Sequence, residues 1–268
     1  ILAKQYQVFK NYGSYNGRYG LPIALGQFKP EYNVAVLEMA CDTFGEIGEM
    51  ARITQPEVGV ITTINKTHLA YLGTLNNIAA EKGRLIEALP FNGSAILNAD
   101  DPRVAGMVPR TQARILTFGL TPGADVQATD LAVKPDGVAF NLHYDGQTYR
   151  GHSPLLGRHQ IYPILAALTT GLVFDVPLEL ALEAVAELSA SLAHEIKNPL
   201  ASIRSAVEQI SRGRLGGEDR ATLESLVVTE SDRLSRLLSD FIEFSALRMG
   251  RTQRVDLVEL IRDCLPIV

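Results

Sequence analysis

The chain lacks a long apolar run, a basic tract and a cysteine framework, and each absence narrows its class. Its longest apolar stretch, 164–174, is shorter than the about 20 residues that span a bilayer, and its beginning does not read as a signal peptide. A net charge of −5 without a basic run argues against nucleic acid as the main partner. Cys41 and Cys264 have neither metal-ligand spacing nor a disulfide pattern. We therefore predict a protein of the reducing cytoplasm.

The 268 residues, 46% of them hydrophobic, suffice for one large or two ordinary domains. Short β-branched runs alternate with helical stretches over the first half. The runs predicted as strands are 34–39, 58–64, 94–98 and 113–118, and the helical stretches are 46–53, 75–89 and 102–107. This alternation predicts an α/β fold with a doubly wound parallel sheet, and functional groups at the carboxyl ends of its strands.

The pattern changes to alternating residues between 125 and 150, with turn signals at 135–137 and 145–146. It predicts a small antiparallel β meander after the parallel sheet. A helix is expected from about His159 to Phe174, and Pro177 opens another.

The most specific motif lies in the last third, where His194, Glu195 and Asn198 share one helical turn and Pro199 follows. The surrounding apolar residues recur at steps of three and four and form the seam of an amphipathic helix: Leu188, Leu192, Ile196, Ile203, Val207 and Ile210. His194 lies off this seam, so we expect it to face solvent. Pro199 cannot donate to the carbonyl of Glu195, so we expect a kink just past the histidine.

These residues resemble the phosphoacceptor motif of the bacterial sensor histidine kinases, over about 186–251. The resemblance implies that His194 takes the phosphoryl group, that Glu195 acts as its base and that Asn198 orients water during dephosphorylation of a response regulator. It also implies two partners, a response-regulator receiver domain and a separate kinase catalytic domain. The alternative is an ordinary helical hairpin with a surface histidine.

A polar turn at 213–217 ends this first helix, and a second is expected from about Asp219. Two helices cannot bury both seams alone, so we predict an all-α hairpin that dimerises through 186–251 into a four-helix bundle. Residues 252–268 read as the start of a kinase ATP-binding domain.

Three ionisable residues of the first part stand where chemistry is expected. Glu38 ends a predicted strand, His68 follows another, and Lys82 lies on the helix after that. Taken singly, they read as a solvated carboxylate, a structural histidine and a surface lysine. Their local sequences, however, resemble the central domain of the Mur ligases over residues 1–185: Gly45-Glu46-Ile47, Thr67-His68-Leu69, Ala80-Glu81-Lys82, Leu97-Asn98-Ala99-Asp100-Asp101-Pro102 and Gly157-Arg158-His159. Motifs near the start, Ser14-Tyr15-Asn16-Gly17 and Gly20-Leu21-Pro22, indicate one branch of that family.

The Mur ligase resemblance implies ATP-dependent amide ligation through an acyl phosphate, with ATP and Mg²⁺ as cofactors. Glu38 and His68 would bind the metal, and Lys82 would be carbamylated. Residues assigned to nucleotide binding are His159, Asn98 and Asp100. A carboxylate with a carbamate suits the oxygen preference of Mg²⁺.

Three departures from the ligase pattern put ATP binding in doubt. No Gly-x-x-x-x-Gly-Lys-Thr phosphate loop occurs in 1–268; it would lie just before Ile1. Gln160 and Pro163 stand where the family has asparagines near adenine. The carboxy-terminal ligase domain expected after Val185 is replaced by the kinase-like hairpin.

The junction between the two resemblances, 181–196, reads as one unbroken helix without a flexible linker. Both ends of the sequence read as cuts through domains. Two interpretations therefore remain open, a genuine fusion of two domains and a chimeric sequence joined from two unrelated sources. Three functional hypotheses follow: a phosphoacceptor at His194 joined to a truncated ligase-like domain, an amide ligase of peptidoglycan precursor synthesis carried by 1–185, and a remnant with neither activity.

Overall fold

The structure is a computed structural model, and it describes residues 1–11, 15–66, 69–134, 137–155, 157–211, 220 and 222–231. The side chains of 69–70, 188–202, 204 and 211 are not described. Parts of the sequence-based expectations therefore lie outside the described residues: the turn at 213–217, the hairpin beyond 231 and the segment 252–268.

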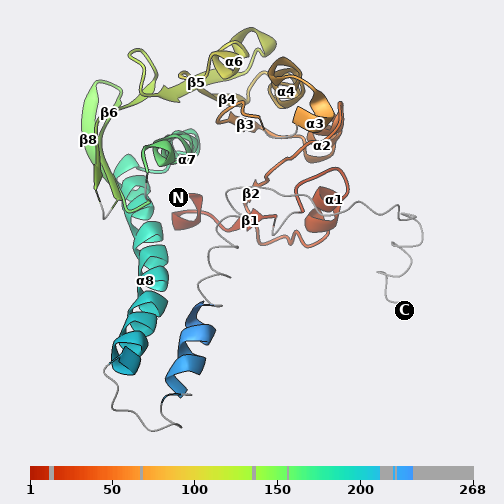
Figure 1. The fold of residues 1–268 in the computed structure, drawn as a ribbon. Helices are drawn as coiled ribbons and strands as arrows, with labels where there is room; N and C mark the ends of the chain where they lie inside the picture. Colours follow the sequence, from red (N-terminus) through yellow and green to blue (C-terminus); the bar gives the residue numbers. More distant parts are fainter. Residues whose placement is uncertain are drawn as a thin grey trace, which may run out of the picture.

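A six-stranded mixed sheet forms the body of the α/β part (Figure 1). Its strand order is β3-β4-β5-β6-β7-β8, with β3 at Val58–Ile61, β4 at Ser94–Asn98, β5 at Arg114–Gly119, β6 at Val126–Lys134, β7 at Gly137–Tyr144 and β8 at Gln147–Ser153. Pairing from β3 to β6 is parallel, and β6, β7 and β8 pair antiparallel. The predicted meander is thus confirmed, and it continues the parallel sheet. Asp145 and Gly146 both have positive φ at the β7–β8 turn, as the turn signal required.

The prediction of a single sheet containing 34–39 was wrong for the described residues. Strand β2 (Val34–Val36) pairs parallel with β1 (Val8–Lys10) in a separate two-stranded sheet. The sequence pattern identified β2 as a buried-type strand but carried no information about its neighbour. Figure 1 shows this pair apart from β3 and β4.

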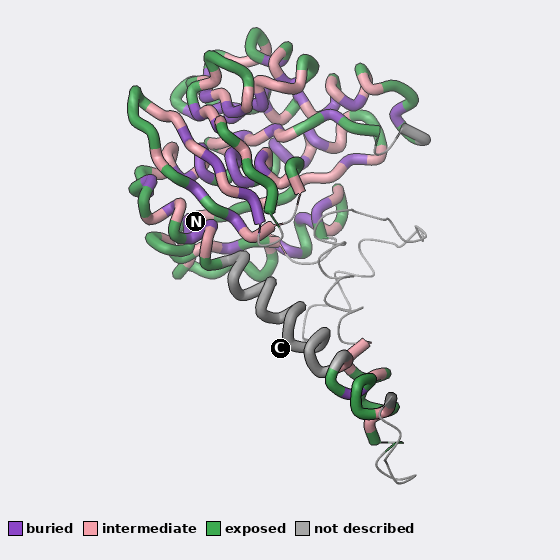
Figure 2. The backbone as a smooth tube through the Cα atoms, turned by 60° about the vertical axis from the view of Figure 1, so that its left-hand side comes forward, coloured by how far each residue is buried: buried purple, intermediate pink, exposed green. Residues whose placement is uncertain are grey.

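Helices cover the two faces of the sheet and define two cores. On one face, α7 (Ile161–Val173) and the start of α8 (Leu178–Ser211) pack on β4 to β8 around Phe118, Phe140 and Leu142. On the other face lie α2 (Glu46–Thr54), α4 (Leu75–Lys82), α5 (Arg84–Glu87) and α6 (Pro102–Ala105). The short elements are η1 (Leu2–Lys4), α1 (Gly20–Leu25), α3 (Leu69–Leu72), η2 (Val108–Arg110) and η3 (Arg158–Gln160). The buried residues concentrate in this α/β part (Figure 2).

The helix expected over 75–89 is interrupted at Gly83, between α4 and α5. The Arg110 guanidinium occupies the space that a Cβ at Gly83 would need. From there Arg110 donates to the carbonyls of Ala79 and Ala80, at 3.1 and 2.9 Å, near the carboxyl end of α4. The Ala79 carbonyl also accepts from the Gly83 N–H at 2.9 Å, so the distant arginine adds a second donor at the carboxyl end of α4.

Helix α8 runs from Leu178 to Ser211 without a break, which confirms the continuous helix predicted over 181–196. Leu178, Ala181 and Val185 are buried against the first core, and Lys4 forms an ion pair with Glu187 at 2.5 Å. Beyond this point α8 extends away from the α/β part (Figures 1 and 2). Residues 222–231 are also helical, in the stretch where the second helix was expected.

None of the helices in the described ranges is both long and apolar enough to cross a membrane.

The carboxylate of Glu81 is fully buried and binds the amino-terminal end of α2. It accepts hydrogen bonds from the backbone N–H groups of Gly45 and Ile47, at 2.9 and 3.0 Å, and from Arg84 Nε at 3.0 Å. Gly45 adopts a φ of 96°, a left-handed conformation that suits glycine, just before the helix begins. A negative charge at a helix amino terminus also interacts favourably with the helix dipole.

We predict that Glu81→Ala lowers the free energy of unfolding by about 3 kcal/mol, because it leaves buried N–H groups without an acceptor. Glu81→Gln, which keeps one acceptor oxygen, should cost about half as much. Urea unfolding followed by circular dichroism measures both. Glu57→Gln, at an exposed side chain, is the control, and equal midpoints for all four proteins would contradict the assignment.

Candidate functional site

Glu38 lies just beyond the carboxyl end of β2 and is held there by two asparagines. Its backbone N–H donates to Asn11 Oδ1 at 2.9 Å, and its carbonyl accepts from Asn11 Nδ2 at 3.1 Å. Its carboxylate Oε1 accepts from Nδ2 of the buried Asn16 at 3.1 Å. The side chain of Glu38 is otherwise exposed, so one carboxylate oxygen remains available to a ligand.

Lys82, at the end of α4, lines the same cavity as Glu38. The cavity measures about 710 Å³ and reaches from the carboxyl ends of β2 and β3 into the space between the two sheets. The structure thus brings together two of the three residues assigned to the metal site. The third, His68, lies outside the described residues. Within the described ranges, no cluster of three or more His, Cys, Asp and Glu residues could hold a metal ion.

Cys41 lies buried in the wall of this cavity. Burial raises the pKa of its thiol to about 11, and the positive charge of Lys82 opposes that rise. The thiol is therefore protonated at neutral pH, which does not favour a nucleophilic role.

Asn98 and Asp100, assigned to the nucleotide, take part in a network at the ends of β3, β4 and β5. Buried Asn98 donates to the carbonyl of Thr62 at 2.7 Å and accepts from the backbone N–H of Asp100 at 2.9 Å. Asp100 accepts from the backbone N–H groups of Leu120 and Thr121, at 2.7 and 2.9 Å, and from the Tyr162 hydroxyl at 3.1 Å. In the structure these two side chains hold strand ends together.

Asp101, which the sequence analysis did not single out, caps α6 through the backbone N–H groups of Arg103 and Val104. Its other oxygen accepts from the Ile64 N–H at 2.7 Å and the Thr63 hydroxyl at 3.1 Å. An aspartate directly before a proline and a short helix was the available signal, since this is the N-cap pattern.

His159, the third residue assigned to the nucleotide, lies exposed in η3, with Nε2 at 3.2 Å from the Gln160 side-chain amide. The structure does not connect it by a hydrogen bond to Asn98 or Asp100. These assignments remain predictions.

The residues of the phosphoacceptor motif lie on α8, beyond its last buried residue in the α/β part. The backbone of His194, Glu195 and Asn198 is helical, while their side chains are not described. The helix continues through Pro199. Further along, Ala206 is buried, whereas Val207 of the predicted seam is 47% exposed.

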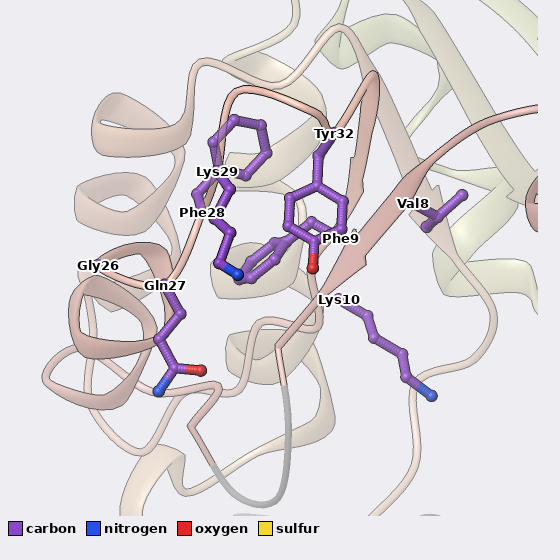
Figure 3. A pocket seen from close by; sticks show the side chains of 8 residues that line it. All are labelled: Val8, Phe9, Lys10, Gly26, Gln27, Phe28, Lys29 and Tyr32. Carbon is purple, nitrogen blue, oxygen red and sulfur yellow. The ribbon is translucent and has the colours of Figure 1, made fainter.

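A second hollow, of about 560 Å³, lies beside β1 and contains none of the predicted site residues. Phe9, Phe28 and Tyr32 face one another there, with ring centroids 5.4 to 5.7 Å apart, while the Lys10 side chain points away (Figure 3). The rings attach the segment after α1 to β1 by apolar packing.

Sequence reasoning missed the residues that hold the site in place. Asn11 and Asp101 bond to backbone groups of distant segments, and Asn16 bonds to the carboxylate of Glu38. Asn16 and Asp101 lay in motifs that had been noted, but neither had been assigned a role, and Asn11 lay in none.

The strand-end network makes a prediction for acid stability. Burial acts to raise the pKa of Asp100, but hydrogen bonds from Thr121, Leu120 and Tyr162 outweigh it and hold that pKa below 3.8. The same balance, with bonds from Ile64, Arg103, Thr63 and Val104, lowers the pKa of Asp101. Because the folded-state pKa values are depressed, this stabilisation is present above the ordinary carboxyl pKa and is lost as the pH falls through the folded values.

We therefore expect the Asp100→Asn/Asp101→Asn double variant to lose less stability than wild type between about pH 5 and pH 2. Urea unfolding at several pH values measures this slope. Glu57→Gln should keep the wild-type slope, and parallel curves for the double variant and wild type would refute the proposed linkage.

The comparisons with known proteins divide the chain into the same two parts. The family model "Mur ligase middle domain" matches residues 1–171, and the model "His Kinase A (phospho-acceptor) domain" matches 184–250. Two similar proteins are UDP-N-acetylmuramoyl-tripeptide–D-alanyl-D-alanine ligases. They belong to the branch of the family that the motifs near Asn16 and Gly20 indicated. The Bacillus subtilis enzyme is 30% identical over 66% of this chain and 37% of its own length. The Escherichia coli enzyme is 31% identical over 71% and 42%.

Two solved structures show the same fold. MurF from Acinetobacter baumannii superposes with a TM-score of 0.65 at 26% identity, over 69% of this chain and 40% of the other. MurF ligase from Thermotoga maritima in complex with ADP gives 0.60 at 28% identity, over 68% and 43%. The chain thus spans about two fifths of the length of these relatives.

Because the family model of the Mur ligase middle domain matches 171 of its 268 residues, the chain belongs to the Mur ligase family, and its residues 184–250 are similar to the phosphoacceptor domain of the histidine kinases.

Proposed function

We propose that the α/β part contributes the magnesium- and nucleotide-binding side of an ATP-dependent amide ligase acting on peptidoglycan precursors. The observation that carries this proposal is the shared cavity of Glu38 and Lys82. The substrate class is supported by the relatives, which are named as ligases of UDP-N-acetylmuramoyl peptides. Nucleotide binding is supported by one similar structure, which is a complex with ADP.

The donor set suits magnesium in part. Glu38 presents a hard carboxylate oxygen at the end of a strand. The Asn11 side chain fixes its backbone there, since it donates to the Glu38 carbonyl and accepts from the Glu38 N–H. The ammonium of Lys82 would repel a cation, whereas a carbamate on its nitrogen would add an anionic oxygen ligand. His68 would complete the set. ATP, when bound with Mg²⁺, supplies the phosphoryl group that activates a carboxylate for attack by an amine.

We expect Mg²⁺-ATP to bind the chain and Glu38→Ala to weaken that binding by about tenfold or more, because the variant removes a metal ligand. Isothermal titration calorimetry with and without Mg²⁺ provides the measurement. Glu57→Ala is the matched control, since that carboxylate lies on the same cavity wall outside the assigned site. Undetectable ATP binding by the intact chain would sink the proposal.

The second proposal is that the chain accepts a phosphoryl group at His194 and passes it to an aspartate of a response regulator. The match of the phosphoacceptor family model to 184–250 favours it. In this proposal Glu195 is the base, Asn198 orients the water of dephosphorylation, and a homodimer through 186–251 supplies the four-helix bundle. A separate kinase catalytic domain would supply the phosphate.

Incubation with such a catalytic domain and ATP should give the chain an acid-labile, alkali-stable phosphate that is absent from His194→Gln. Autoradiography after acid or alkali treatment measures it. His152→Gln, at an exposed histidine of β8, should label like wild type. Equal labelling of His194→Gln and wild type would show that the assignment is wrong.

A further inference from the structure

The two carboxylate oxygens of Glu38 have unequal surroundings. Oε1 accepts a hydrogen bond from Asn16 Nδ2 at 3.1 Å, whereas Oε2 receives no hydrogen bond from the part of the chain that the structure describes. Glu38 is an exposed residue, so Oε2 is open to a ligand from solvent. One oxygen is therefore occupied by a donor of the protein, and the other is free.

The amide of Asn16 is fixed in its position beside Glu38. Asn16 is only 4% exposed, and its backbone carbonyl accepts from the Ala40 N–H at 2.8 Å. The chain turns tightly just after it, since a Cβ at Gly20 would lie 2.7 Å from Tyr15 Cα. A carboxylate only accepts hydrogen bonds, so the nitrogen of the amide must face it. The turn thus holds an N–H donor against Oε1.

The backbone of Glu38 is fixed as well. The Asn11 side chain accepts from the Glu38 N–H at 2.9 Å and donates to the Glu38 carbonyl at 3.1 Å. Asn11 also donates to the carbonyl of Tyr15 at 2.9 Å, which joins the turn that carries Asn16 to the end of β2. With its backbone and Oε1 both bonded, the carboxylate of Glu38 has little freedom to rotate.

Magnesium and calcium make different demands on a carboxylate. Mg²⁺ is small, requires a near-octahedral arrangement and keeps several waters, so the narrow angle between the two oxygens of one carboxylate suits it poorly. Ca²⁺ takes about six to eight oxygen ligands in a flexible arrangement and often binds both oxygens of one carboxylate. An N–H group directed at Oε1 opposes this second contact, because the positive end of its dipole and the cation repel each other.

We propose that Asn16 is a specificity-determining residue, which limits Glu38 to contact with a metal ion through one oxygen and so favours Mg²⁺ over Ca²⁺. The inference rests on the proposed function in one respect, that Glu38 is a metal ligand. It does not depend on ATP binding or on phosphorylation of His194. Asn16 is a positioning residue in this proposal, since it acts on the metal through Glu38.

The test titrates the full chain with magnesium chloride and, separately, with calcium chloride, without nucleotide. NMR spectra that follow the backbone amide of Glu38 give both affinities. We expect the wild type to bind Mg²⁺ more tightly than Ca²⁺. Asn16→Leu is similar in size and lacks the donor, so it frees Oε1 and should shift the ratio of the two affinities about tenfold toward Ca²⁺.

The ratio separates a role in specificity from a role in folding alone, which would lower both affinities together. Asn16→Ala also lacks the donor and should shift the ratio in the same direction as Asn16→Leu. Asn141→Leu is the matched control, because Asn141 Nδ2 donates to a carboxylate oxygen of Asp130 at 2.7 Å in the six-stranded sheet. It should keep the wild-type ratio. Circular dichroism establishes that each variant keeps the fold.

The inference is overturned, while the metal site stands, if both Asn16 variants keep the wild-type ratio and Glu38→Ala abolishes metal binding. Tighter binding of Ca²⁺ than of Mg²⁺ by the wild type also overturns it and requires no variant. If the wild type does not bind Mg²⁺, or if Glu38→Ala binds it equally well, Glu38 is not a metal ligand, and the proposed function fails together with this inference.

Discussion

The arrangement of the second core depends on one buried negative charge, the carboxylate of Glu81. It accepts hydrogen bonds from N–H groups at the amino-terminal end of α2 and from the Arg84 guanidinium, so α2, α4 and the start of α5 are joined by charge-assisted hydrogen bonds to one buried carboxylate. The adjoining Lys82 then projects from a fixed helix end into the cavity. A structural residue and a candidate functional residue are thus neighbours in the chain, and the first positions the second.

Local patterns predicted most elements, because burial on a sheet or helix face imposes a period on the sequence. The strand predicted over 94–98 has the same boundaries as β4, and the helix predicted over 46–53 ends one residue before α2 does. Two features of the fold involve non-local contacts that the local patterns do not contain. The helix expected over 75–89 is divided at Gly83, beside which lies the guanidinium of Arg110, 27 residues further along the sequence. Strand pairing likewise depends on what lies beside β2 in space, which its own residues do not encode.

The candidate site shows the same division. Glu38 and Lys82 could be selected from motifs because the family resemblance supplied their context, and the cavity brings them together. The partners of Glu38 could not be selected, since Asn11 and Asn16 bond to it across 27 and 22 residues. Asn98 and Asp100 also have a structural role, which their motif alone did not distinguish from a role in ligand binding. Their bonds hold the ends of β3, β4 and β5, which any ligand at that edge of the sheet requires.

The continuity of α8 has a geometric consequence for the two parts of the chain. The helix leaves the first core near Val185, and residue 194 follows nine residues later. At about 1.5 Å and 100° per residue, the position of residue 194 is displaced by about 13 Å along the helix axis and by two and a half turns around it. A single inserted or deleted residue between them would turn every later side chain by about 100° relative to the α/β part. The rotational position of residue 194 about the helix axis is therefore set by the number of residues that separate it from the α/β part.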